Sequence, residues 1–300
     1  MDGRSQRLQA EDVRIAPWWV TVVASGGYGF LLVAANSLWA GPVLEALGQV
    51  QHATAGLLPA RFLMSLAAFA FLAVVIFWIA RLKPADVGWH ASALAPALGI
   101  TLLCWALMQV GLCILAFALR DRPALTATDS GLLRLVLPMA TDLLGNSWLE
   151  ETFFRGYLLQ QLFRRMVLRC SRRAAWWCAA LGALLLFVLA HVPRFIGSPE
   201  DLPAGVGLAV LWAACFGGLL TVVFLVTGNL FLCVGLHALH NARPMLLAAP
   251  WQRVEIMWWV VTLAVILVWS VNEARKRARA ARTGTGAHAP ASQESVRDMA

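Results

Sequence analysis

Long apolar blocks separated by short polar connections constrain the fold of this chain more than any other feature. Hydrophobic residues make up 60% of the sequence and charged residues only 13%, whereas a soluble domain is about half apolar and about a quarter charged. Several blocks reach the roughly 20 residues that a helix needs to cross a bilayer. The sequence therefore predicts an all-α protein, a polytopic bundle of about eight transmembrane helices.

Eight segments have the composition of membrane spans. They cover about residues 17–38, 62–80, 93–119, 135–163, 174–191, 204–226, 229–247 and 256–271. We predict a cytoplasmic tail over residues 1–16 and a transmembrane domain over residues 17–272. Residues 273–300 are predicted to form a basic, disordered tail, because the end of the chain is rich in Ala, Gly, Thr and Ser.

The basic residues predict an orientation in the membrane. They collect in the two tails and in the connections after the second and fourth segments. With eight crossings these four regions fall on one side, and the positive-inside rule makes that side cytoplasmic, with both termini inside. The net charge of +8 then indicates contact with anionic membrane lipid and not with nucleic acid. Few Lys and many Arg and Ala residues favour a bacterial inner membrane.

The fourth segment carries ionisable residues, each of which costs roughly 2.5 to 3.5 kcal/mol at the centre of a spanning helix. Such residues need partners or a purpose. Glu151 and Arg155 are four positions apart and can pair on one helix face, while Glu150 is rotated from Glu151 by about 100°. Asp142, Asn146 and Glu150 are spaced by four, which predicts a polar stripe that faces other helices.

Two later segments carry polar pairs at the same spacing. Phe187 and His191 are four apart in the fifth segment, and His237 and Asn241 are four apart in the seventh. Each pair shares a helix face, and His240 could lie near the second pair.

The position of each residue along its segment predicts a depth. Glu150 and His191 are equally distant in sequence from the turn at Cys170 and Ser171, so both count to roughly 20 Å into the bilayer at about 1.5 Å per residue. His237 counts to a shallower depth.

Taken in order on separate spanning helices, Glu-Glu-x-x-x-Arg, Phe-x-x-x-His and His-x-x-x-Asn resemble the motifs of the CAAX-protease and bacteriocin-processing (CPBP) family of intramembrane proteases. The resemblance covers residues 142–248. It implies a glutamate-type endopeptidase that acts on a membrane-associated or lipidated peptide or protein. No cofactor is implied.

The resemblance also implies roles for the motif residues. Glu150 would activate a water with help from His191, and His237 with Asn241 would stabilise the oxyanion of the tetrahedral intermediate. This chemistry is reasonable in itself, since amide hydrolysis needs a base for water and donors aimed at the developing oxyanion.

Three further motif residues are implied to have supporting roles. Glu151 and Arg155 would hold the helix and its charge balance, and Phe187 would shape the pocket. His240 is not part of the motif, and the sequence leaves its role open.

Other mechanisms and functions stay open at this point. Glu and His also bind zinc, so a metal-dependent peptidase is an alternative, although the sequence holds no His-Glu-x-x-His. It also lacks the Gly-x-Ser-x-Gly motif of serine hydrolases. Buried ionisable residues are equally typical of proton-coupled transporters, which often carry inverted repeats, and we find none. A non-catalytic membrane immunity or scaffold protein is the remaining alternative.

Overall fold

The computed structural model describes residues 14–35, 41–121, 125, 133–197 and 205–282. Across these ranges the protein is helical, and they contain no strand beyond an isolated bridge between Leu125 and Leu247. The predicted all-α class is confirmed. The helices are α1 (Trp18–Ala35), α2 (Gly41–Ala53), α3 (Ala60–Ala73), η2 (Val74–Ile79), η3 (Pro84–Val87), α4 (Ala91–Ala118), α5 (Leu133–Leu144), α6 (Asn146–Glu151), η4 (Thr152–Leu159), α7 (Gln160–Met166), α8 (Arg172–Gly197), α9 (Gly205–Thr227), α10 (Leu230–Ala242) and α11 (Trp251–Arg282).

Each of the eight predicted segments contains a helix, and α2 is a short helix that the sequence did not predict. Five helical stretches in the described part of the chain are long and apolar enough to cross a membrane. The apolar parts of α1 and α10 are shorter, and the fourth predicted segment is divided among α5, α6, η4 and α7. The protein is a multi-pass membrane protein.

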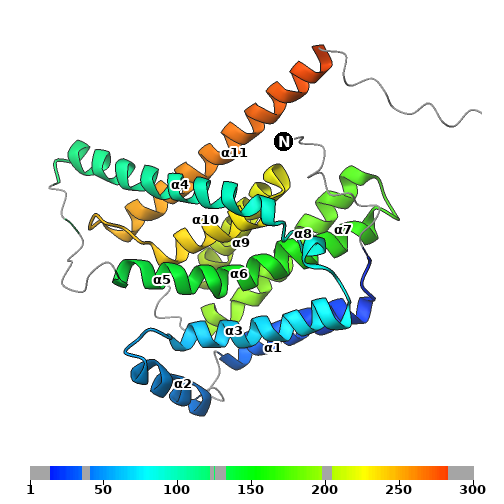
Figure 1. Ribbon diagram of the computed structural model, residues 1–300, viewed down its shortest axis with the longest axis horizontal. Coiled ribbons are helices and arrows are strands. Elements are labelled where there is room, and N and C mark those ends of the chain that lie inside the picture. Colours follow the sequence, from blue (N-terminus) through cyan, green and yellow to red (C-terminus); the bar gives the residue numbers. More distant parts are fainter. Residues whose placement is uncertain (1–13, 36–40, 122–124, 126–132, 198–204, 283–300) are drawn as a thin grey trace, which may run out of the picture.

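The C-terminal helix differs from the prediction at its end. Helix α11 continues to Arg282, past the boundary predicted at residue 272, so residues 273–282 are helical. Ala, Arg, Lys and Glu dominate this stretch, and all four are strong helix formers. Figure 1 shows the end of α11 extending away from the other helices. The rest of the predicted tail, residues 283–300, and residues 1–13 lie outside the described ranges.

The segment that carries the acidic motif is not a regular helix. Gly145 has φ −112° and ψ −100°, and these dihedrals interrupt the helix between α5 and α6. Figure 1 shows the two helices roughly in line across the middle of the molecule. The motif then continues into η4, a π-helix. Its wider turns change the direction of the side chains that follow, and π-turns within helices are frequent at functional sites.

Helix α10 lies at the centre of the bundle, packed against α4, α5, α6, α9 and α11. Its approach to α4 is so close that a Cβ on Gly235 would lie 2.1 Å from Oγ1 of Thr101. Asn229 begins the helix: its side chain accepts a hydrogen bond from the Leu232 N–H at 3.2 Å and donates to the Ala93 carbonyl at 3.0 Å. The turn into α10 is therefore buried within the bundle.

We expect Gly156→Ala to lower the melting temperature of the purified protein in detergent. A Cβ at Gly156 in η4 would lie 2.5 Å from the backbone carbonyl oxygen of Val87. Because that neighbour is backbone, η4 or the chain at Val87 must move, and overpacking of this kind destabilises by about 1–3 kcal/mol. Gly99→Ala is the control, since nothing lies within 4 Å of its Cβ position. Equal melting of Gly156→Ala and wild type would contradict the close packing of η4.

Candidate active site

Three side chains from three helices meet inside the bundle. Oε2 of Glu150 in α6 lies 3.8 Å from Nε2 of His191 in α8 and 4.0 Å from Nε2 of His237 in α10. Only 6% of the Glu150 side chain and 3% of the His237 side chain are exposed, against 18% for His191. The structure therefore places the carboxylate between two imidazoles, with His191 on the more accessible side.

The shallower depth expected for His237 is a wrong prediction. Counting residues from a segment end presumes that the end lies at the membrane surface, whereas Thr227 and Asn229, at the turn into α10, are each only 5% exposed. The buried start of α10 carries His237 to the level of Glu150 and His191.

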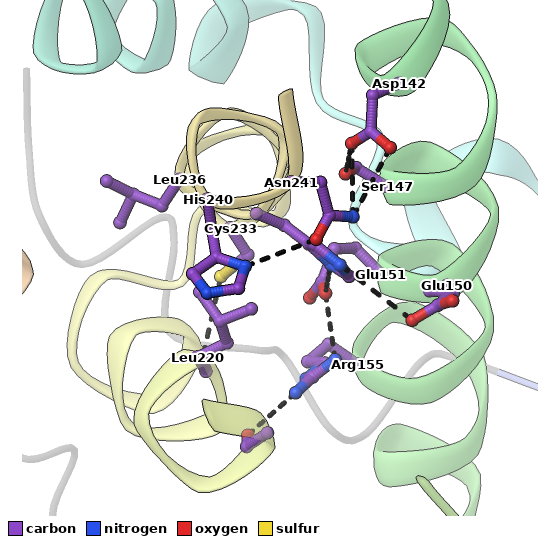
Figure 2. Close-up of polar contacts among 12 residues, drawn as sticks. Asp142, Ser147, Glu150, Glu151, Arg155, Leu220, Cys233, Leu236, His240 and Asn241 are labelled. Atoms are coloured by element: carbon purple, nitrogen blue, oxygen red, sulfur yellow. Dashed lines mark hydrogen bonds and ion pairs between the residues drawn. The ribbon is translucent and has the colours of Figure 1, made fainter. Parts of the chain in front are cut away.

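Glu151 is the most enclosed charged group of the site, with no exposed surface. Its Oε1 accepts hydrogen bonds from Nη1 of Arg155 at 2.9 Å and from Nδ1 of His237 at 2.7 Å. The predicted pairing of Glu151 with Arg155 is thus present. The second guanidinium nitrogen of Arg155, Nη2, donates to the Gly217 carbonyl of α9 at 2.7 Å, so this network joins α6, η4, α9 and α10, as Figure 2 shows.

Phe187 separates the ion pair from His191. The guanidinium carbon of Arg155 lies 4.8 Å from the centre of the Phe187 ring, and the imidazole of His191 lies 4.4 Å from that centre. The Phe187 carbonyl also accepts a hydrogen bond from Nδ1 of His191 at 2.8 Å. Because a carbonyl oxygen only accepts, Nδ1 carries a proton, and Nε2 is the ring nitrogen turned towards Glu150.

Glu150 differs from its neighbour in its hydrogen bonding. Its Oε2 is buried and accepts no hydrogen bond from the described residues. A buried polar atom in this condition costs free energy, and such atoms often mark catalytic positions. Oε2 of Glu151 also lacks a hydrogen-bond partner among the described residues. The two glutamates differ in that Glu151 has two donors on its Oε1, whereas Oε2 of Glu150 faces two imidazole nitrogens just beyond direct hydrogen-bond distance.

Asn241 lies at the edge of this cluster and is itself exposed. Its Nδ2 donates to the two carboxylate oxygens of Asp142 at 3.3 and 3.4 Å, and its Oδ1 lies 3.2 Å from Nδ1 of His240. The hydroxyl of Ser147 also donates to Asp142. Two members of the predicted polar stripe, Asp142 and Glu150, therefore face other helices. The break at Gly145 brings Ser147, one position beyond Asn146, against Asp142.

The structure adds a residue that sequence reasoning missed. Glu255 of α11 lies 3.0 Å from Nε2 of His240, which gives this histidine a partner. The available signal was that an acidic residue within a spanning helix is a functional candidate by default. The last predicted segment begins at residue 256, one position after Glu255.

No group of three His, Cys, Asp or Glu side chains in the described ranges is arranged to hold a metal ion. The described residues therefore supply no ligand set for the zinc-dependent alternative.

Fold and site together define a multi-pass membrane protein with a buried carboxylate–histidine centre. Residues 132–243 match the family model of type II CAAX prenyl endopeptidases, Rce1-like, and form an Rce1-like domain, consistent with the predicted CPBP resemblance. This domain contains every candidate residue predicted from the sequence. No curated protein and no solved structure matches the chain. The match supports intramembrane endopeptidase activity in general terms.

We expect Arg155→Met to destabilise the protein strongly, by about 3–5 kcal/mol, because it leaves Glu151 buried without its main counter-charge. The double variant Glu151→Gln/Arg155→Met should recover part of this loss, since it removes the uncompensated carboxylate. Thermal unfolding in detergent measures both. Lys276→Met, which breaks the exposed pair of Lys276 with Glu273, is the control and should change stability by less than about 1 kcal/mol. A double variant as unstable as Arg155→Met would argue against charge compensation.

Proposed function

We propose that the protein hydrolyses a peptide bond of a membrane-associated or lipidated peptide or protein, using a water activated by Glu150. The observation that carries the proposal is the position of the Glu150 carboxylate, 3.8 and 4.0 Å from the nearest nitrogens of His191 and His237. These separations exceed a direct hydrogen bond. They suit one water held between Glu150 and His191, where its proton can pass to the carboxylate.

The chemical steps follow general acid–base catalysis. The water attacks the peptide carbonyl carbon as its proton moves to Glu150, which forms a tetrahedral intermediate. Glu150 then returns this proton to the departing amine nitrogen as the C–N bond breaks. His191 orients the water through Nε2, and Glu150 acts as base and then as acid.

Two further residues would stabilise the oxyanion. His237 is suited to this because Glu151 holds its Nδ1–H, so a second proton on Nε2 would be directed to the reaction side. The amide group of Asn241 carries two N–H bonds. One N–H shared between the two oxygens of Asp142 would leave the other for the oxyanion. Donors of this kind each contribute about 10²–10³-fold to the rate of acyl transfer.

We expect Glu150→Gln and His191→Ala each to reduce cleavage at least about 10²-fold, the lower range for an acid–base group. The assay uses purified protein and a library of membrane-tethered peptides, with products identified by mass spectrometry. Glu273→Gln, which alters an exposed carboxylate of α11, is the control and should cleave like wild type. Cleavage that survives both active-site substitutions would overturn the mechanism.

The same assay separates the alternative functions. Solute flux into proteoliposomes without any cleavage would favour a transporter, and neither flux nor cleavage would favour an immunity or scaffold protein.

We propose a mechanism without a cofactor, so cleavage should be unchanged after dialysis against a chelator. Activity that is lost on chelation and regained with zinc would instead establish the metal-dependent alternative.

We further propose that the protein resides in a bacterial inner membrane with both termini cytoplasmic, in contact with anionic lipid. Contacts that involve three of the basic regions support placing these regions on one side of the membrane. Arg165 donates to the Ala16 carbonyl, which joins α7 to the start of α1. The connection that carries Lys83 leads into η3, which packs on η4.

Cysteine labelling tests this orientation. Cys170 is exposed in the connection between α7 and α8. In a variant that keeps only this cysteine, an impermeant maleimide should label inside-out vesicles and not spheroplasts. Asp121 follows the C-terminal end of α4. In a cysteine-free background, Asp121→Cys should be labelled in spheroplasts and not in inside-out vesicles. Labelling of Cys170 in spheroplasts would mean the opposite orientation.

A further inference from the structure

A histidine–carboxylate pair lies beside the proposed catalytic centre, between α10 and α11. Nε2 of His240 is 3.0 Å from Oε2 and 3.2 Å from Oε1 of Glu255. Glu255 also accepts hydrogen bonds from the indole N–H groups of Trp259 at 2.9 Å and of Trp212 at 3.2 Å. These contacts from α9, α10 and α11 give the carboxylate one position.

The other ring nitrogen of His240 faces Asn241. Nδ1 lies 3.2 Å from Oδ1 of the Asn241 amide, although neighbouring side chains of a helix diverge by about 100°. The contact occurs in the last turn of α10, where Arg243 ends the helix with a φ of 46°. Hydrogen bonds therefore run from Glu255 through His240 and Asn241 to Asp142, that is, from α11 through α10 to α5.

The hydrogen bonds in this chain have a defined direction. The Asp142 carboxylate only accepts, so the NH₂ end of Asn241 must face it, and the carbonyl end must face His240. Glu255 also only accepts. Each nitrogen of His240 therefore faces an acceptor, an arrangement in which both can donate only if the ring is protonated.

Aromatic side chains from α9 and α11 enclose the ring of His240. The ring is 4% exposed, and its centre lies 4.5 Å from that of Phe216, 4.9 Å from that of Trp258 and 5.1 Å from that of Trp212. Glu255 supplies the carboxylate that a buried imidazolium needs, and Nη2 of Arg243 lies 3.8 Å from Oε2 of the same carboxylate.

We propose that His240, charged and held by Glu255, is a positioning residue that fixes the Asn241 amide with its N–H groups turned towards Asp142 and the reaction centre. Neither His240 nor Glu255 touches the substrate in this scheme. A reversed amide would present its carbonyl oxygen to the oxyanion, which would repel it. The positioning of Asn241 rests on these contacts. Its effect on catalysis rests on the proposed function.

Nitrogen NMR tests the positioning without any assay of activity. The sample is the full-length protein in nanodiscs, labelled with ¹⁵N at histidine or asparagine, and His240→Gln and Asn241→Ala assign the two signals. In wild type at neutral pH we expect two protonated ring nitrogens for His240 and one ordered side-chain amide for Asn241. In Glu255→Gln we expect a neutral His240 ring and exchange-broadened Asn241 signals. A neutral His240 in wild type, or an Asn241 amide unchanged in Glu255→Gln, would overturn the proposal.

Kinetics test the catalytic consequence, with the best-cleaved membrane-tethered peptide from the library as the probe. Glu255→Gln and His240→Gln should each lower kcat about 10-fold or more and leave KM within about 2-fold, because only transition-state binding is affected. Neither should lower kcat further in an Asn241→Ala background, since the residues act through one group. Losses that multiply in that background would contradict the proposal.

Two controls make the result specific. Arg253 lies on α11, as Glu255 does, and forms a 2.5 Å ion pair with Asp121. Arg253→Gln breaks this pair and should leave both the NMR signals and kcat unchanged. Trp259→Phe removes one N–H from Glu255 and serves as a milder variant if Glu255→Gln does not fold. Wild-type protein that cleaves no peptide but shows the expected NMR signals would refute the peptidase and retain the positioning.

Discussion

The ion pair of Glu151 with Arg155, completed by His237, is the interaction on which the rest of the structure depends. Glu151 has no exposed surface, and a carboxylate so enclosed must be compensated by protein groups. Arg155 supplies the charge and continues to the Gly217 carbonyl of α9 and the Phe187 ring of α8. His237 supplies the second hydrogen bond from α10. This network of contacts thus links five helical elements around the candidate site, namely α6, η4, α8, α9 and α10.

This arrangement gives two adjacent glutamates different properties. The turn of about 100° between neighbouring helical residues directs Glu151 to its donors and Glu150 towards two imidazoles. Because Glu151 holds Nδ1 of His237, the other nitrogen of that ring lies on the Glu150 side. Glu151 therefore sets the orientation of the His237 ring, whose other nitrogen faces Glu150. The same logic recurs where Glu255 orients His240 and, through it, Asn241.

Irregular backbone makes these contacts geometrically compatible. A straight helix from α5 to α7 would carry Asp142 and Glu150 on one continuous stripe. The break at Gly145 and the π-helix η4 let Asp142 contact the end of α10 while Glu150 contacts its middle. The close approach of α10 to α4 at Gly235 keeps the short central helix fixed between its neighbours.

The sequence by itself determined the helical class, the approximate spans and the local pairs, because these depend on apolar length and on i, i+4 spacing within one helix. Glu151 with Arg155 and Phe187 with His191 are such pairs. The depth of His237, the contact of Ser147 with Asp142 and the partnership of Glu255 with His240 were decided only by the tertiary structure. Each depends on how helices are placed relative to one another, and a buried turn or a broken helix leaves no periodic signal. The helical course of residues 273–282 follows from local propensity, because strong helix formers dominate this stretch.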